Sequence, residues 1–290
     1  MAQMLLAERA ARLRELLSGP RLVRVAGAHS GVSARLVEAS GFDAVWASSF
    51  ELSTAYALPD AGILTMSEAL EAARVMSEAV SIPVIADCDT GYGDPPNVAH
   101  MVRRYESGGI AAICMEDQVF PKVNSLVSAD QRLLDLELFA AKVRAAKRAQ
   151  RTADLVVIAR TEALISGRGV HEALRRAGAY VEAGADAILV HSKAPTPIEV
   201  WGFLAAWEGR APVVVVPTTY FDVDVAEFER HGVSVVIYAN HGLRAAVRAM
   251  RETLGELRRS GSSRCVEDRI ATVAELLELQ GMPALMEARR

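Results

Sequence analysis

The stretch at residues 110–117, "IAAICMED", is the strand-like run that best indicates the fold of the chain. A short apolar run that ends in two acids is typical of a buried strand that reaches a polar rim. A second such run, "DLVVIARTE" at 154–162, follows a segment with helical apolar spacing, "LELFAAKVRAAKRA" at 136–149. Strand, helix and strand in this order indicate a parallel sheet with both faces covered.

Six further apolar or β-branched runs recur on either side of this unit. They lie at 21–27, 43–49, 81–89, 186–192, 211–218 and 233–240. Helical spacing separates several of them, as at 66–79 and 171–184. Eight strand units within roughly 220 residues favour an α/β fold of the (β/α)8 TIM-barrel type over an open sheet. We predict one barrel domain over 1–290, with a leading N-terminal helix and extra C-terminal helices, 260–290 forming a helical extension.

Composition excludes several classes of protein. The chain has 290 residues, 51% of them hydrophobic, which is enough for a large core. A net charge of -4 offers no basic stripe, so we expect no nucleic-acid partner. The N-terminus, "MAQMLLAERAARLRELL", carries charges throughout and no run reaches spanning length, so we expect a cytoplasmic protein without membrane contact. The three cysteines lie far apart, which argues against zinc and disulfides.

Polar side chains gather where the predicted strands end, which is the rim that carries chemistry in this fold. They are Ser48, Ser49, Asp87, Asp89, Glu116, Arg160, Glu162, His191 and Asn240. Any one of them is more often a helix cap or a turn residue. Their convergence on one rim favours a functional site.

The rim residues suit a hard cation and an anion. Side chains alternate along a strand, so Asp87 and Asp89 point to one side, and Glu116 joins them from the next strand. This all-oxygen cluster suits Mg2+, although the acids would equally pair with Lys or Arg across the barrel mouth. Arg160 offers a fork of donors for phosphoryl or carboxylate oxygens, and His191 adds a further donor. We therefore expect a small anionic substrate.

Six motifs in one order resemble the phosphoenolpyruvate mutase and isocitrate lyase superfamily. They are "DCDTGYGD", "MEDQVFPKVNSL", "VVIARTEALISGRG", "AGADAILVHSK", "VVVVPTTY" and "VIYANHGLRAAV". The likeness covers roughly residues 20–280, and it is strongest to phosphoenolpyruvate phosphomutases and phosphonopyruvate hydrolases, which act on phosphonopyruvate with Mg2+. The resemblance implies that Asp87 ligates Mg2+, directly or with help from Asp89, Glu116 and Asp60 through water.

The same resemblance implies how substrate is held. Ser48 and the backbone amides of Ser49 and Phe50 would bind the pyruvyl carboxylate and enolate, and Trp46 would line the pocket. The phosphoryl group would be held by Arg160, His191 and Asn124. Residues 117–135 would form a gating loop that carries Lys122 and Asn124 inward to exclude water, as lids do elsewhere. Asp60 would capture the phosphoryl group covalently or only steer it.

Two segments bear on the reaction and disagree. Lyases of the superfamily carry a cysteine in a Lys-Lys-Cys-Gly-His loop motif, whereas this loop reads "PKVNS" at 121–125, so carbon-carbon cleavage is the least expected activity. Asn124 matches the mutases, where the hydrolases have threonine. The segment at 50–70, "FELSTAYALPDAGILTMSEAL", instead resembles the hydrolases. We predict a phosphoenolpyruvate phosphomutase, with phosphonopyruvate hydrolase as the alternative.

The superfamily also implies an assembly. Its members are usually homotetramers, dimers of dimers that exchange their C-terminal helices. The apolar spacing of "ATVAELLELQGMPALMEA" at 271–288 fits such a swap, and it fits an intramolecular cap as well.

Overall fold

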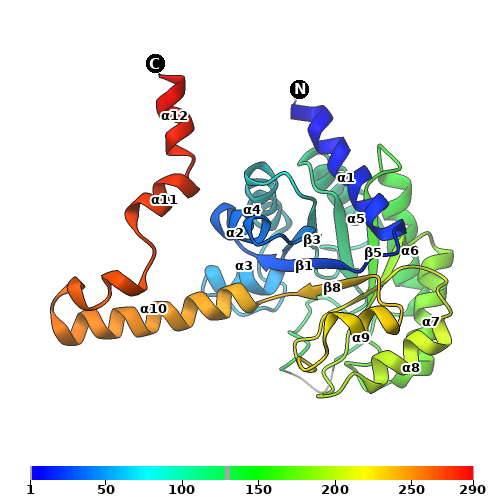
Figure 1. Cartoon of the computed structure of the whole chain (residues 1–290). Coiled ribbons are helices and arrows are strands. Elements are labelled where there is room, and N and C mark those ends of the chain that lie inside the picture. The colour runs from blue at the N-terminus through cyan, green and yellow to red at the C-terminus, as the bar shows by residue number, and fades with distance from the viewer. Residues whose placement is uncertain (1, 128–130, 290) are drawn as a thin grey trace. The chain divides into compact units, whose positions relative to one another are not determined.

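The computed structural model describes residues 2–127 and 131–289. Its strands form a closed parallel barrel in the order β1 to β8, surrounded by helices (Figure 1). The strands are β1 (Val23–Ala28), β2 (Ala44–Ala47), β3 (Val84–Asp87), β4 (Ala112–Glu116), β5 (Val156–Thr161), β6 (Ala187–Val190), β7 (Val213–Val215) and β8 (Val235–Tyr238). The predicted (β/α)8 barrel is therefore confirmed.

Helices precede and separate the strands of the barrel, including those expected at 66–79, 136–149 and 171–184. They are α1 (Ala2–Ser18), α2 (Gly31–Ala39), α3 (Ser49–Ala55), α4 (Met66–Ala79), α5 (Pro95–Ser107), α6 (Leu136–Ala149), α7 (Gly169–Glu182), α8 (Ile198–Trp207) and α9 (Val225–Arg230). A capping box between Thr65 and Glu68 fixes the start of α4. Asp135 caps α6 by accepting from two first-turn amides. No helix among the described residues is long and apolar enough to cross a membrane.

Every second side chain of a strand points into the barrel. Ile85, Cys114, Ile158 and Leu189 belong to the inner core cluster. Two residues after each of these side chains, the chain has Asp87, Glu116, Arg160 and His191, respectively. The alternation that fills the barrel interior therefore also directs these polar side chains into its mouth.

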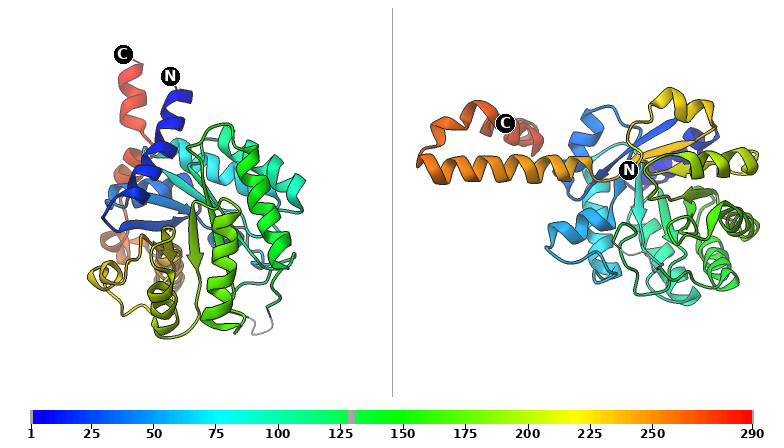
Figure 2. Two further views of the ribbon diagram at one scale, coloured as in Figure 1. Left: turned by 90° about the vertical axis from the view of Figure 1, so that its right-hand side faces the viewer. Right: turned by 90° about the horizontal axis from the view of Figure 1, so that it is seen from below.

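Helix α1 covers the opposite end of the barrel. Leu13 is fully buried there among the inner side chains. Arg14 donates hydrogen bonds to the carbonyl oxygens of Asp154 and Leu155, just before β5, and lies 3.1 Å from Asp186. Figure 2 (left view) shows α1 at the end away from the loop that follows β4. The helix therefore covers the amino-terminal end and leaves chemistry to the carboxyl-terminal rim.

The residues from His241 onward form a second compact unit, whereas those up to Asn240 form the barrel. The second unit contains α10 (His241–Ser260), two short 3-10 helices, α11 (Val273–Leu279) and α12 (Met282–Ala288). The second unit thus contains α10 as well as the C-terminal extension that the sequence predicted at 260–290. Large apolar side chains are exposed on α11 and α12, including Val273 and Met286. An exchange of these helices between subunits stays a prediction.

Leu13→Ala tests the role of α1. We expect the free energy of unfolding to fall by about 2–5 kcal/mol, the usual cost of deleting a fully buried leucine side chain. Urea denaturation of the whole chain measures it. Leu36→Ala makes the same change on α2 at a residue that is 50% exposed, and it should cost less than about 0.5 kcal/mol. Equal effects of the two substitutions would show that α1 does not close the core.

Candidate active site

A pocket of about 80 Å³ opens at the carboxyl-terminal mouth of the barrel. It brings together eleven residues that the sequence placed at the rim or in the site: Trp46, Ser48, Ser49, Phe50, Asp60, Asp87, Lys122, Asn124, Arg160, His191 and Asn240. Three of the residues named from the sequence do not line it: Glu162, which is described below, and the proposed metal-site residues Asp89 and Glu116. Asp89 pairs with Lys122, and Glu116 pairs with Arg160, so both lie one residue behind the pocket wall.

The turn after β3 sets the direction of two carboxylates. Asp87 ends the strand, and Asp89 follows with a left-handed backbone, φ +47°. Gly91 also has a positive φ, +88°. A Cβ atom there would lie 2.9 Å from Val98 Cγ2 and 3.0 Å from Met115 Sδ, so only glycine fits. The turn thus packs against α5 and β4 and keeps both carboxylates at the mouth.

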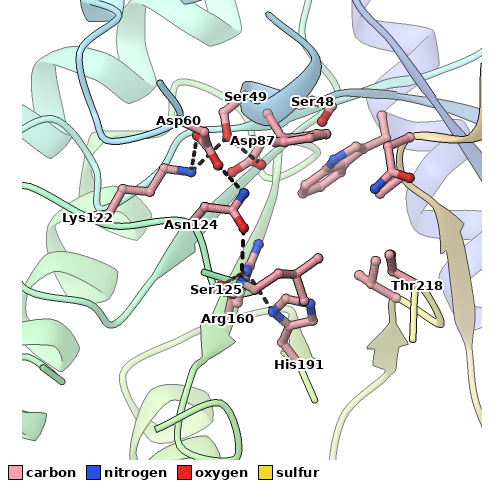
Figure 3. A pocket seen from close by; sticks show the side chains of 16 residues that line it. Ser48, Ser49, Asp60, Asp87, Lys122, Asn124, Ser125, Arg160, His191 and Thr218 are labelled. Carbon is pink, nitrogen blue, oxygen red and sulfur yellow. Dashed lines mark hydrogen bonds and ion pairs between the residues drawn. The ribbon is translucent and has the colours of Figure 1, made fainter. Parts of the chain in front are cut away.

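Lys122 lies among the carboxylates rather than in solvent. Its Nζ is 2.8 Å from Asp60 Oδ1 and 2.8 Å from Asp89 Oδ1, and it donates to Ser49 Oγ at 3.2 Å. The Ser49 hydroxyl in turn donates to Asp87 Oδ2 at 2.8 Å. Figure 3 shows the lysine reaching from the loop toward Asp60 and Ser49. Burial alone would lower the pKa of Lys122, but Asp89 and the other acids raise it well above the usual value, so the amine stays charged.

Four residues form a second group, which we call the clamp cluster: Ser125, Arg160, Glu162 and His191. Arg160 Nη2 donates to Ser125 Oγ at 2.9 Å and lies 2.8 Å from His191 Nδ1. Arg160 Nε pairs with Glu162 Oε1, which also lies 3.1 Å from His191 Nδ1. Burial, and then the nearby Arg160 charge, lower the pKa of His191, which favours a neutral imidazole. The guanidinium is thus fixed and faces the pocket (Figure 3).

The sequence placed Glu162 at the rim without giving it a specific role, and it gave Ser125 no role. Glu162 is fully buried, and its Oε2 accepts a hydrogen bond from Ser125 Oγ at 2.8 Å. Burial would raise the pKa of Glu162, but Arg160 and His191 lower it, so it stays ionised. Alternation along β5 gives Glu162 the same side as Arg160, a signal that indicates its place at the rim but not its partners. The contact of Ser125 depends on the path of the loop, for which the sequence has no periodic signal.

Asn124 contacts Asp60. Its Nδ2 donates to Asp60 Oδ2 at 2.7 Å, and its Oδ1 accepts from the backbone N–H of Leu126 at 3.0 Å. The second contact fixes the orientation of the side-chain amide. The sequence grouped Asn124 with Arg160 and His191, whereas the structure joins it to the acid across the pocket.

The mouth of the barrel carries more negative than positive charge. The buried acid side chains are Asp60, Asp87, Asp89, Glu116 and Glu162, and the cations among them are Lys122 and Arg160. Burial raises the pKa of Asp87, and it raises the pKa of Glu116 to about 8. Glu116 Oε1 is buried without a hydrogen-bond partner in the described part of the chain. A further cation at this place would therefore be stabilising.

These residues fit Mg2+ held through few direct ligands. Within residues 2–127 and 131–289, no three His, Cys, Asp or Glu side chains are spaced to hold a metal ion together. The Lys122 amine instead lies between Asp60 and Asp89. Mg2+ usually takes one or two carboxylates and keeps several waters. Asp87 borders the pocket, and the unpartnered Glu116 oxygen adds to an all-oxygen donor set.

Comparison with known proteins identifies the family of the chain. Residues 13–258 match the family model described as phosphoenolpyruvate phosphomutase. The chain is 48% identical over 273 residues to phosphonopyruvate hydrolase from Variovorax sp. (strain Pal2), covering 93% of this chain and 93% of that protein.

Two solved structures match over nearly the whole chain. A crystal structure of phosphoenolpyruvate phosphomutase from Streptomyces platensis subsp. rosaceus superposes with a TM-score of 0.95 at 50% identity, covering 96% of this chain and 97% of that one. A crystal structure of phosphonopyruvate hydrolase in complex with oxalate and Mg2+ superposes with a TM-score of 0.91 at 45% identity, with the same coverage. By family model, sequence identity and structure, the chain belongs to the phosphoenolpyruvate mutase family, within the phosphoenolpyruvate mutase and isocitrate lyase superfamily.

Proposed function

We propose that this chain is a phosphomutase that interconverts phosphoenolpyruvate and phosphonopyruvate in the presence of Mg2+. The reaction moves a phosphoryl group between the enol oxygen and C3 of the pyruvyl unit. The family includes proteins named as mutases and as hydrolases, so the choice between the two reactions must depend on a local feature of the site. That feature is the hydrogen bond from Asn124 to Asp60. A shorter threonine at this position would not span the gap and would leave room for water beside Asp60.

The organic end of the substrate would lie between α3 and the acid cluster. Ser48 caps α3, and the backbone N–H groups of Ser49 and Phe50 begin its first turn at the pocket wall. These donors suit the carboxylate and enolate oxygens of pyruvate. Mg2+, when bound through Asp87, would neutralise the charge that develops on those oxygens.

The clamp cluster would hold the phosphoryl group. Arg160 presents a guanidinium that Glu162 and Ser125 already fix in place, and His191 lies beside it. Transfer of a phosphoryl group passes through a loose transition state, so catalysis consists mainly of positioning and charge stabilisation. A fixed fork of donors costs little reorganisation when the substrate arrives.

Asp60 would act on the phosphorus from the side opposite the clamp cluster. Lys122 holds one of its carboxylate oxygens and Asn124 holds the other. In covalent transfer, the carboxylate would accept the phosphoryl group from the enol oxygen and release the pyruvate enolate. C3 of the enolate would then attack phosphorus and free Asp60. If Asp60 only steers the group, the same two contacts keep it facing the path of transfer.

The β4–α6 loop would keep the reaction dry. Lys122, Asn124, Ser125 and Leu126 all line the pocket from this loop. The loop is joined across its two limbs, because Gln131 Nε2 donates to the carbonyl oxygens of Val123 and Asn124 at 3.3 and 3.1 Å. A water within reach of the phosphorus would divert the reaction to phosphate and pyruvate, so the loop separates the two outcomes.

One observation favours the hydrolase as the second candidate. Asn240, at the end of β8, lines the pocket and its Oδ1 is buried without a hydrogen-bond partner in the described chain. Thr218 lines the same wall. These groups would suit a bound water, which a hydrolase requires.

We also propose that the protein is a homotetramer with exchanged C-terminal helices. The apolar side chains exposed on α11 and α12 support an apolar partner surface. Light scattering of the whole chain should give four times the mass of one chain. A monomer across the micromolar range would rule the exchange out.

The main test follows the products of phosphonopyruvate and Mg2+ by phosphorus NMR. We expect phosphoenolpyruvate as the main product and little inorganic phosphate. Asn124→Thr should slow isomerisation and raise the share of phosphate, because it opens the space beside Asp60. Val123→Thr changes an exposed neighbour in the loop and should leave the ratio unchanged. Phosphate and pyruvate as the dominant products of the unmodified protein would assign it to the hydrolases.

Asp87→Ala tests the metal site by calorimetry with Mg2+ and oxalate, an enolpyruvate mimic. We expect Mg2+-dependent oxalate binding to be lost, because Asp87 borders the pocket and is the proposed direct ligand. Asp89→Ala and Glu116→Ala should weaken Mg2+-dependent oxalate binding by only about 10- to 100-fold. This is the usual cost of removing a residue that contacts a metal ligand but not the metal ion itself. Asp222→Ala, at an exposed position after β7, is the matched control. Unchanged binding in Asp87→Ala would mean that the carboxylates are structural.

A further inference from the structure

A buried ion pair lies behind the active site, outside the residues that line the pocket. Asp117 follows Glu116 directly and is fully buried. Its Oδ1 accepts from the backbone N–H of Glu162 at 2.8 Å. Its Oδ2 accepts from Tyr180 OH at 2.6 Å, Arg176 Nη1 at 3.0 Å and Thr161 Oγ1 at 3.2 Å. One carboxylate therefore ties the end of β4 to the end of β5 and to α7.

Arg176 extends these contacts to the far limb of the loop. It is 6% exposed, and its Nη1 also donates to the carbonyl oxygen of Leu134 at 3.0 Å. The backbone N–H of Leu134 donates to the carbonyl oxygen of Asp117 at 2.8 Å. The Nε of Arg176 is held by Glu172 within α7. The guanidinium thus binds the place where the β4–α6 loop returns to the barrel.

Contacts lead from this pair to both walls of the pocket. Asp117 fixes the backbone of Glu162, and the Glu162 side chain holds Arg160 and Ser125. On the loop side, the limb that ends at Leu134 pairs with the outgoing limb. Gln118 and Leu133 form an antiparallel β-bridge, and the N–H of Val119 donates to the carbonyl oxygen of Arg132. The side-chain amide of Gln131 donates to the carbonyl oxygen of Asn124.

We propose that Asp117 and Arg176 are positioning residues that set the clamp cluster and the loop relative to each other. The proposal rests on the proposed function, because it predicts that the pair governs how the transferring phosphoryl group divides between C3 and water. Neither residue touches the substrate. Their effect would pass through Glu162 on one wall and through Leu134 and the loop on the other.

Arg176→Lys is the main variant. Lysine keeps the positive charge beside Asp117, but its single nitrogen cannot reproduce the planar fork that reaches Asp117, Leu134 and Glu172 together. Arg175→Lys is the matched control, since Arg175 is exposed, lies on the same helix and also pairs with Glu172. Both variants are compared with the unmodified chain.

Three readouts separate positioning from stability. Trypsin cleavage after Lys122, followed by mass spectrometry, reports how often the loop leaves the pocket. We expect it to rise at least about tenfold in Arg176→Lys, the change expected when a hydrogen bond to a charged group is lost. Oxalate affinity with Mg2+ should stay within about threefold, because the acid cluster is untouched. The kcat should fall more than the KM changes, and the share of phosphate among the products should rise.

A milder variant keeps the proposal testable if Arg176→Lys does not fold. Tyr180→Phe removes one hydrogen bond to Asp117 and keeps the ring, so it should give a smaller change in the same direction. The proposal would be overturned if a folded Arg176→Lys or Tyr180→Phe variant matched the control Arg175→Lys in two respects. These are the rate of trypsin cleavage after Lys122 and the ratio of the two products. Faster cleavage at all sites together, which indicates general instability, would also overturn it. If the unmodified chain makes neither product, the proposed function fails, and the cleavage after Lys122 still decides the role of the pair.

Discussion

Buried negative charge at the mouth of the barrel is the constraint on which the site depends. Asp60, Asp87, Asp89 and Glu116 lie within a shell that excludes most solvent, and ionised carboxylates there need cations close by. Lys122 supplies one of them, and it comes from the loop rather than from the barrel. The position of the loop is therefore tied to the charge of the cluster. A metal ion added to the cluster and the Lys122 amine would share the same carboxylates.

The barrel explains why these acids meet. Inward side chains alternate along each strand, so the positions that pack the interior lead directly to the positions at the mouth. Helix α1 covers the other end through Leu13 and Arg14, which leaves the carboxyl-terminal rim for binding. Stability and chemistry thus lie at opposite ends of one structure, as is usual for this fold. The ion pair of Asp117 and Arg176 lies at the carboxyl-terminal end and joins the ends of β4 and β5 to α7.

The periodic parts of the structure were predictable from the sequence, and the loop contacts were not. Alternation predicted the strands and the inward side of Asp87, whereas the turn after β3, with its left-handed Asp89, places the second carboxylate. Helical spacing predicted α4 and α6 at their observed bounds. The partners of Lys122 and Asn124 depend on the path of a loop, which no period describes. Arg176 is a charged residue in a helix, a pattern typical of a solvated face, and only the tertiary fold shows that it is buried.

The most direct test of this account is a crystal structure of the chain with Mg2+ and oxalate. We expect a metal ion about 2.0–2.1 Å from a carboxylate oxygen of Asp87, with waters completing an octahedral shell. Oxalate should lie between Ser48 and Arg160, with Asn124 still in contact with Asp60. A metal ion bound away from Asp87, or oxalate bound without metal while Lys122 alone balances the acids, would contradict it.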